Sequence, residues 1–147
     1  MYSKIVVATD GSELSIRSLR TAAFMARQEK AAVTVVTVTS GLIAAGYGTM
    51  GSAAAEVIVA QAEAEKLHAN DVLQAARTVL LESGITADYV HVPDREPADG
   101  IIQVCEKVGA GLIIMGSHGR RGLQRLLLGS EATHVLTLSK VPVLIVK

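Results

Sequence analysis

The sequence is poor in cysteine and in aromatic residues: it has one cysteine, Cys105, no tryptophan and one phenylalanine. A single cysteine cannot form an internal disulfide, which excludes a disulfide framework and fits a reducing compartment. Aromatic residues make up 3% and apolar residues 50% of the 147 residues, so we expect an aliphatic core in one domain spanning residues 1–147. The same shortage argues against a flavin carrier, because flavin rings are commonly stacked on aromatic side chains.

An excess of charge of one sign is also lacking, because 14 Lys and Arg residues balance 14 Asp and Glu residues. Nucleic-acid-binding proteins usually carry a basic excess, so this balance argues against a nucleic-acid partner. No run approaches the roughly 18 consecutive apolar residues of a membrane span. The N-terminal MYSKIVVATD does not have the charged and then apolar pattern of a signal peptide. We therefore expect a cytoplasmic protein with neither a nucleic-acid nor a membrane partner.

What the sequence does contain is a series of short aliphatic runs, several of them β-branched. Runs that are apolar at nearly every position are typical of strands covered on both faces, as in a parallel sheet. The runs predict five strands, of which the third has the weakest pattern: Ile5–Ala8, Val33–Val38, Ala87–Val92, Leu112–Met115 and Val143–Val146.

Apolar residues at helical spacing lie between these runs and predict four helices. Pro97 suits a first helical turn, and Gly84 suits a C-terminal stop. The alternation predicts an α/β fold, an open doubly wound five-stranded parallel sheet with helices on both faces. The helical stripes are Ile16, Leu19, Ala23 and Ala26; Leu73, Ala76 and Leu80; Ala98, Ile101, Ile102, Cys105 and Val108; and Ala132, Val135 and Leu136.

One stretch does not fit this alternation of short loops. Residues Val38 to Ala55 are rich in glycine, alanine and serine. This stretch is too long for an ordinary connection between a strand and a helix, so it is predicted to be a mobile lid or disordered.

Ligands of open α/β sheets bind beyond the carboxyl ends of the strands, where the winding reverses. If the strand order is 3-2-1-4-5, the loops after the first and fourth strands face one crevice. These loops are TDGSE, Thr9–Glu13, and MGSHGRRG, which begins at Met115. They are the two loops richest in glycine and polar groups, so we expect the ligand between them.

The second of these loops has the composition of a phosphate site. Gly116 and Gly119 let backbone amides approach an anion closely. Gly129-Ser130 opens the last predicted helix, whose N-terminus offers free amide hydrogens and a partial positive charge. Three arginines add cationic side chains nearby: Arg120, Arg121 and Arg125.

Each feature also has an ordinary structural explanation. Ser130 alone suits a helix N-cap, and Asp10 with Glu13 resembles a capping box. Loop arginines are usually solvated, and His118 alone is more often a surface histidine than a ligand or a base. The histidines and acids show no metal-ligand spacing. The functional interpretation depends on the coincidence of these features in one crevice.

With these residues assembled, the chain resembles the universal stress protein family over essentially its whole length. Gly116-Ser117-His118-Gly119, nine further residues and Gly129-Ser130 match the G-x2-G-x9-G-[S/T] motif of the ATP-binding branch of that family. The beginning, KIVVATDGSELS, and the end, SKVPVLIVK, are also similar to that family. The resemblance implies an adenine nucleotide alpha hydrolase-like sheet in the order 3-2-1-4-5, with ATP across the first and fourth loops.

The resemblance also implies roles for individual residues. Asp10 would hold the ribose or the adenine side, and Val38 would contact the base. Ala8 and Thr9 would line the pocket, and Met115 would form its floor. The phosphates, with Mg or Mn as a possible companion, would lie against the loop and the following helix: Gly116, Ser117, His118, Gly119, Arg120, Gly129, Ser130, Glu131 and Ala132.

Glu131 and Ala132 depart from the family pattern, in which a small apolar residue and then a hydroxyl or small residue often follow the Gly-Ser pair. A carboxylate at Glu131 suits a first helical turn but would repel a nearby polyphosphate. Two functions therefore stay open: a nucleotide-binding sensor or regulator of the stress response, and an interaction module of the same fold that binds no nucleotide. No P-loop or nucleophile elbow is present, so binding is favoured over dedicated catalysis, with slow ATP hydrolysis left open.

The last strand predicts an assembly. VPVLIVK is apolar at most positions and would lie at a sheet edge in the assumed order. An exposed apolar edge invites pairing with another chain, and a two-fold dimer covers this edge in each partner. The alternative is an edge shielded by its own helices and by Lys147. We expect a homodimer through the C-terminal strand.

Overall fold

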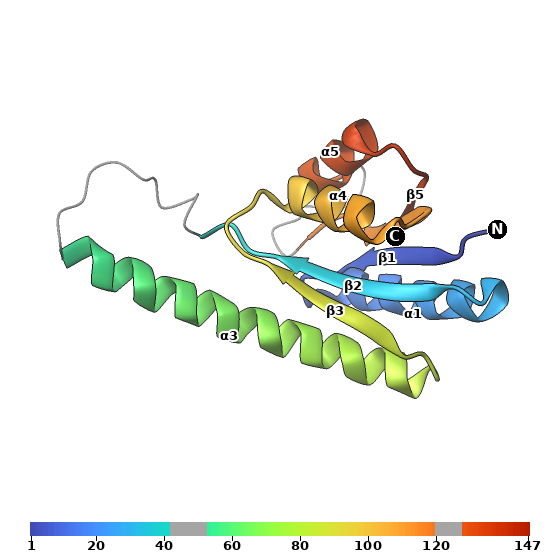
Figure 1. Cartoon of the computed structure of the whole chain (residues 1–147), viewed down its shortest axis with the longest axis horizontal. Coiled ribbons are helices and arrows are strands. Elements are labelled where there is room, and N and C mark those ends of the chain that lie inside the picture. The colour runs from blue at the N-terminus through green and yellow to red at the C-terminus, as the bar shows by residue number, and fades with distance from the viewer. Residues whose placement is uncertain (42–52, 120–127) are drawn as a thin grey trace.

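The computed structural model describes residues 1–41, 53–119 and 128–147, and these form a three-layer α/β sandwich (Figure 1). The predicted alternation of strands and helices is confirmed. The elements follow one another as β1 (Lys4–Ala8), α1 (Glu13–Glu29), β2 (Ala32–Val38), α3 (Ala53–Glu82), β3 (Ala87–Val92), α4 (Pro97–Val108), β4 (Leu112–Gly116), α5 (Ser130–Leu138) and β5 (Val143–Val146).

The five strands form one parallel sheet in the order β3-β2-β1-β4-β5, which confirms the predicted strand order. Val7 of the central strand β1 is in register with Val35 of β2 on one side and with Ile114 of β4 on the other. The chain builds outward from β1 through β2 to β3 and then crosses back to β4. The winding therefore reverses between β1 and β4, where the carboxyl ends of the two strands leave a crevice.

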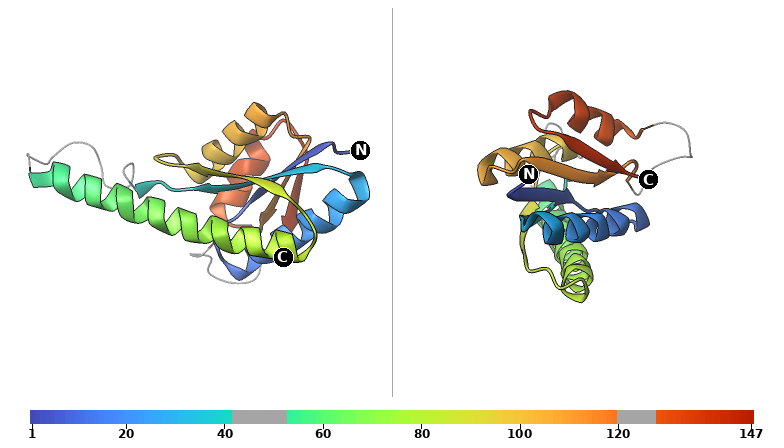
Figure 2. Two further views of the ribbon diagram at one scale, coloured as in Figure 1. Left: turned by 60° about the horizontal axis from the view of Figure 1, so that its bottom comes forward. Right: turned by 90° about the vertical axis from the view of Figure 1, so that its right-hand side faces the viewer.

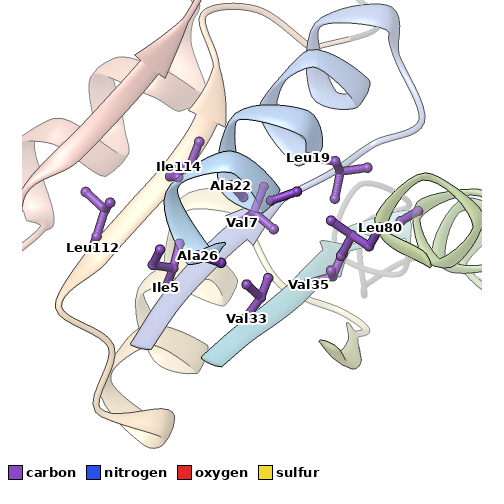
Figure 3. Packing of buried hydrophobic residues seen from close by; sticks show 12 residues of the cluster. Ile5, Val7, Leu19, Ala22, Ala26, Val33, Val35, Leu80, Leu112 and Ile114 are labelled. Carbon is purple, nitrogen blue, oxygen red and sulfur yellow. The ribbon is translucent and has the colours of Figure 1, made fainter. Parts of the chain in front are cut away.

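The sheet is buried on both faces because its strands are apolar at successive positions. In the right-hand view of Figure 2, α4 and α5 lie on one side of the sheet, and α1 and α3 lie on the other. Figure 3 shows the core under α1, where Ile5 and Val7 meet Leu19, and Leu80 joins from α3. The opposite core places Val6 and Ile113 against α4 and α5. Alternate residues of one strand thus serve two cores.

Helix α3 ends where the sequence predicts a stop. Gly84 stands two residues after Glu82, the last residue of α3. Its φ is +72°, a left-handed conformation that residues with a side chain disfavour. The Gly84 amide donates to Leu81 O and the Ile85 amide donates to Leu80 O, which closes the last turn. Pro97 stands in the first turn of α4, as predicted.

Helix α3 is much longer than its predicted apolar stripe. It begins at Ala53, so the last residues of the predicted loop Val38–Ala55 are helical. Residues 42–52, the remaining part on which the prediction of a mobile lid or disorder falls, lie outside the described residues. Only the far end of α3 covers β2 and β3, and its beginning projects past the sheet (Figure 1).

The burial of α3 follows this geometry. In its projecting half, Val57, Val59 and Leu67 are 60%, 63% and 63% exposed, whereas Ala76 and Leu80 near the other end are buried in the core. Despite its length, α3 is not apolar enough to cross a membrane, and no other helix in the described ranges is either.

Candidate functional site

A cavity of about 710 Å³ opens at the carboxyl ends of β1 and β4, where the winding reverses. Its volume is in the range of pockets that hold small molecules and cofactors. It lies between the loop after β1, the loop after β4 and the first turns of α4 and α5. Every predicted site residue that the structure describes lines it: Ala8, Thr9, Asp10, Val38, Met115, Gly116, Ser117, His118, Gly119, Gly129, Ser130, Glu131 and Ala132.

The three arginines predicted near the site are not among the residues that the structure describes. Arg120, Arg121 and Arg125 lie outside the described residues. The assignment of Arg120 to the site therefore stays a prediction. The binding roles of the residues that line the cavity stay predictions as well.

The loop after β1 directs Asp10 into the cavity. The Ser12 amide donates to Asp10 Oδ1 at 2.9 Å, and Ser15 N donates to Ser12 Oγ at 3.3 Å. Ser12 is therefore the N-cap of α1, and the predicted capping box with Asp10 as its cap is wrong. The physical reason is that α1 begins at Glu13, so Asp10 precedes the cap and instead holds the turn that leads to it. Asp10 is thus placed at the cavity wall by its own loop.

Buried hydroxyls support this loop from below. Thr9 Oγ1 donates to Ser15 Oγ at 3.0 Å, and Ser15 Oγ donates to Ser12 O at 2.8 Å. Gly11 has φ +80°, which permits the sharp turn after Asp10. The turn is consequently fixed by bonds within residues 9–15.

The two parts of the glycine motif meet in space. The Gly129 amide donates to Ser117 O at 2.8 Å, and a Cβ on Gly129 would lie 3.0 Å from that oxygen. A Cβ on Gly116 would lie 3.1 Å from Leu14 Cβ. Glycine is needed at Gly116 and Gly129 because backbone and neighbouring segments approach them closely. The motif therefore joins the end of β4 to the start of α5 and to the first turn of α1.

Some backbone amides of the motif donate hydrogen bonds within the protein. Ser117 N donates to Val146 O of β5 at 2.8 Å, and Ser117 Oγ lies 3.0 Å from His118 Nδ1. The amides of Ser117 and Gly129 are therefore directed at protein acceptors. Both residues shape the cavity wall, and an anion would have to use other amides.

Those other amides belong to the first turn of α5. Gly129 is the N-cap and Ser130 is the first helical residue, so the expectation that Ser130 is the N-cap is wrong. The first helical bond runs from Thr133 N to Gly129 O at 3.0 Å. The amides of the three preceding residues have no acceptor within the helix. These amides, at Ser130, Glu131 and Ala132, lie at the cavity wall and make it suitable for an anion.

Glu131 reaches across to another helix. Its Oε2 accepts a hydrogen bond from Ala98 N at 3.1 Å. The N-cap of α4, Glu96, makes no side-chain capping bond. Glu131 thus caps α4 from α5 and ties together two helix starts that line the same cavity.

The rim on the β2 side is held by a side-chain pair. Thr39 Oγ1 lies 2.8 Å from His91 Nε2, and Thr39 follows Val38 directly. Burial lowers the pKa of His91, against the opposing effect of Glu65 and Asp94. The lowered pKa favours the neutral imidazole of His91. The contact between Thr39 and His91 positions the end of β2 beside the cavity.

The cavity contains residues that the sequence interpretation missed. Pro97 marked a helix start, and every helix start of a parallel α/β sheet lies at the carboxyl edge, so α4 could have been included from the sequence. The others lacked a local signal, because their side chains reach the cavity only through packing. The missed residues are Ser15, Val36, Ser40, Glu96, Pro97, Ile101 and Leu128.

The cavity combines an apolar floor with polar side chains and backbone amides. Within residues 1–41, 53–119 and 128–147, no group of three or more His, Cys, Asp or Glu side chains is placed to hold a metal ion. The arrangement offers an aliphatic floor at Met115, a carboxylate at Asp10 and the amides of the α5 start. It suits a molecule with an apolar part, polar groups and an anionic end.

Comparisons with known proteins agree with this geometry. A family model described as "Universal stress protein family" matches residues 1–147. Universal stress protein MJ0531 of Methanocaldococcus jannaschii is 33% identical over 147 residues, which cover 100% of this chain and 83% of that protein.

Two solved structures share the fold. Protein MJ0577 of Methanocaldococcus jannaschii superposes with a TM-score of 0.84 at 26% identity, covering 100% of this chain and 96% of that one. The universal stress protein from Archaeoglobus fulgidus in complex with dAMP has a TM-score of 0.73 at 26% identity, covering 99% and 98% of the two chains. The five-stranded parallel architecture is thus shared with both solved structures, one of which is a complex with dAMP.

Proposed function

We propose that this chain, which belongs to the universal stress protein family, binds ATP in the cavity between β1 and β4 and acts as a sensor or regulator in the stress response. One observation carries the proposal. Two glycine-containing loops that are far apart in the sequence meet at a cavity whose wall includes the first turn of α5, where the amides have no acceptor within the helix. A helix start of this kind is suited to phosphate.

A relative supports the adenine nucleotide as the class of ligand. The universal stress protein from Archaeoglobus fulgidus, 26% identical to this chain, has been solved in complex with dAMP. In the proposed complex here, Asp10 holds the ribose and Val38 contacts the base. Met115 lies under the nucleotide, and the phosphates lie against residues 116–119 and 129–132.

A divalent cation, Mg or Mn, would accompany the triphosphate. The described residues offer no ready-made metal cluster. Phosphate oxygens and water would therefore supply most ligands of the cation, which is common for Mg²⁺. Binding is the proposed activity, since His118, which lies within the motif, is paired with Ser117.

The second candidate is an interaction module that binds no nucleotide. The observation that favours it is the position of Glu131, whose carboxylate lies at the wall where the phosphates would bind. Under this alternative the cavity serves a neutral or cationic ligand or a segment of a partner protein.

ATP binding is expected to be directly measurable. We expect the purified protein to release ATP on denaturation or to take it up with micromolar to millimolar affinity when magnesium is present. Chromatography of the released molecules and calorimetric titration measure the two. Absence of released nucleotide, together with no heat and no thermal shift up to millimolar ATP with magnesium, would leave the second candidate.

We also propose a homodimer through β5, the edge strand of the sheet. Leu144 is 36% exposed there, and among the described strands β5 pairs with β4 alone, so its other edge could pair with a second copy. We expect light scattering at micromolar concentration to give twice the mass of the 15.4 kDa chain. A monomeric mass would contradict pairing at this edge.

A further inference from the structure

Three acidic side chains stand on the described wall of the cavity. Asp10, Glu96 and Glu131 line it, and every other lining side chain in the described ranges is apolar, a hydroxyl, a glycine or His118. A polyphosphate entering this cavity would meet carboxylates as well as helix amides.

The hydrogen bond from Ala98 N to the Glu131 carboxylate affects which helix start can hold an anion. Two helix starts, those of α4 and α5, line the cavity and could each attract an anion. Glu131 Oε2 already accepts the Ala98 amide at 3.1 Å, and so its charge offsets the positive end of α4. Of these two helix starts, only that of α5 is left to hold phosphate, and Glu131 itself belongs to its first turn.

We infer that Glu131 makes this cavity select among adenine nucleotides by their phosphate charge. It favours a monophosphate, or a triphosphate whose charge is reduced by a divalent cation, over the free triphosphate. The inference rests on the proposed function, because it concerns the same cavity. Its physical basis is that the repulsion from one fixed carboxylate grows with each additional phosphate charge nearby.

Two substitutions separate the charge of Glu131 from its capping role. Glu131→Gln removes the charge but keeps a side-chain oxygen that can accept the Ala98 amide. Glu131→Ala removes both the charge and the acceptor. Glu82→Gln, at an exposed position in the last turn of α3 and away from the cavity, is the matched control for the loss of one carboxylate.

Calorimetric titration of the full chain with AMP, magnesium-free ATP and magnesium-ATP tests the inference. We expect Glu131→Gln to strengthen binding of magnesium-free ATP about tenfold and binding of AMP less than about threefold, with magnesium-ATP changed little. The difference between ATP and AMP should shrink at high salt, because screening weakens the repulsion. Glu82→Gln should leave all three affinities unchanged.

The outcomes separate this inference from the proposed function. Equal changes for AMP and ATP, or no change for either, would overturn the charge selection while leaving nucleotide binding in place. If neither the wild-type protein nor Glu131→Gln bound any of the three ligands, the proposed function would fail, and the inference with it. An equal gain in Glu131→Ala and Glu131→Gln would show that the α4 cap contributes nothing to selection and that charge alone acts.

Discussion

Replacing Gly119 with valine is expected to weaken ATP binding about a hundredfold, which corresponds to about 2.7 kcal/mol. A Cβ at Gly119 would lie 3.0 Å from Asp10 Oδ2, and the two methyl groups of valine would extend further into the loop. The substitution therefore displaces the Asp10 carboxylate, which is proposed to hold the ribose. It also adds side-chain volume to the loop at the point where its backbone must approach the phosphates. A lost hydrogen bond to a charged group alone is worth about 1.5–3 kcal/mol.

The same substitution should change folding stability little. Gly119 is exposed and is not among the glycines with positive φ, so valine meets no backbone strain there. Thermal unfolding and ATP titration of the same sample measure the two effects. Gly111→Val is the matched control, since Gly111 precedes β4 at the opposite edge of the sheet and a Cβ there is 3.5 Å from Tyr2. Equal losses of stability and affinity in Gly119→Val would favour a purely structural loop.

The largest loss of stability on α3 is expected for Leu80→Ala, which should lower the free energy of unfolding by about 2–5 kcal/mol. Leu80 is fully buried and joins α3 to the core beneath α1 (Figure 3). Truncation removes apolar contacts and leaves a cavity that a parallel sheet covered on both faces cannot easily collapse. Urea unfolding followed by circular dichroism measures the change.

Leu67→Ala on the same helix is the matched comparison. Leu67 is 63% exposed in the projecting half of α3, so its loss should change the free energy of unfolding by about 0.5 kcal/mol or less. The two variants share residue type, substitution and helix, and differ in burial. A loss at Leu67 as large as that at Leu80 would mean that the projecting half of α3 is covered in solution, for example by a partner.

Local patterns in the sequence were sufficient for most of the architecture. The β-branched runs such as Val33–Val38 were recognised because a strand buried on both faces needs apolar side chains at successive positions. Gly84 and Pro97 were recognised because backbone conformation restricts them to the end and the beginning of a helix. No local pattern fixes the strand order, which only the family resemblance implies.

The helix caps predicted from the sequence are wrong, because the choice among neighbouring capping residues depends on where each helix begins. Asp10 and Ser130 both have side chains suited to capping, but the structure makes Ser12 and Gly129 the caps. Capping propensity is shared by several residue types and shifts easily by one or two positions. The packing of α1 and α5 against the sheet determines which residue stands at the helix start.

The sequence by itself determined the alternation of elements, the aliphatic character of the core and the residues that could meet an anion, because each is a property of composition or of short-range spacing. Only the tertiary structure decided that Glu131 caps α4 through Ala98, that Gly129 bonds to Ser117, and that Glu96 and Ile101 share the cavity. These contacts join residues far apart along the chain. Their formation depends on how the helices pack on the twisted sheet, and no spacing in the sequence encodes a distance between two packed elements.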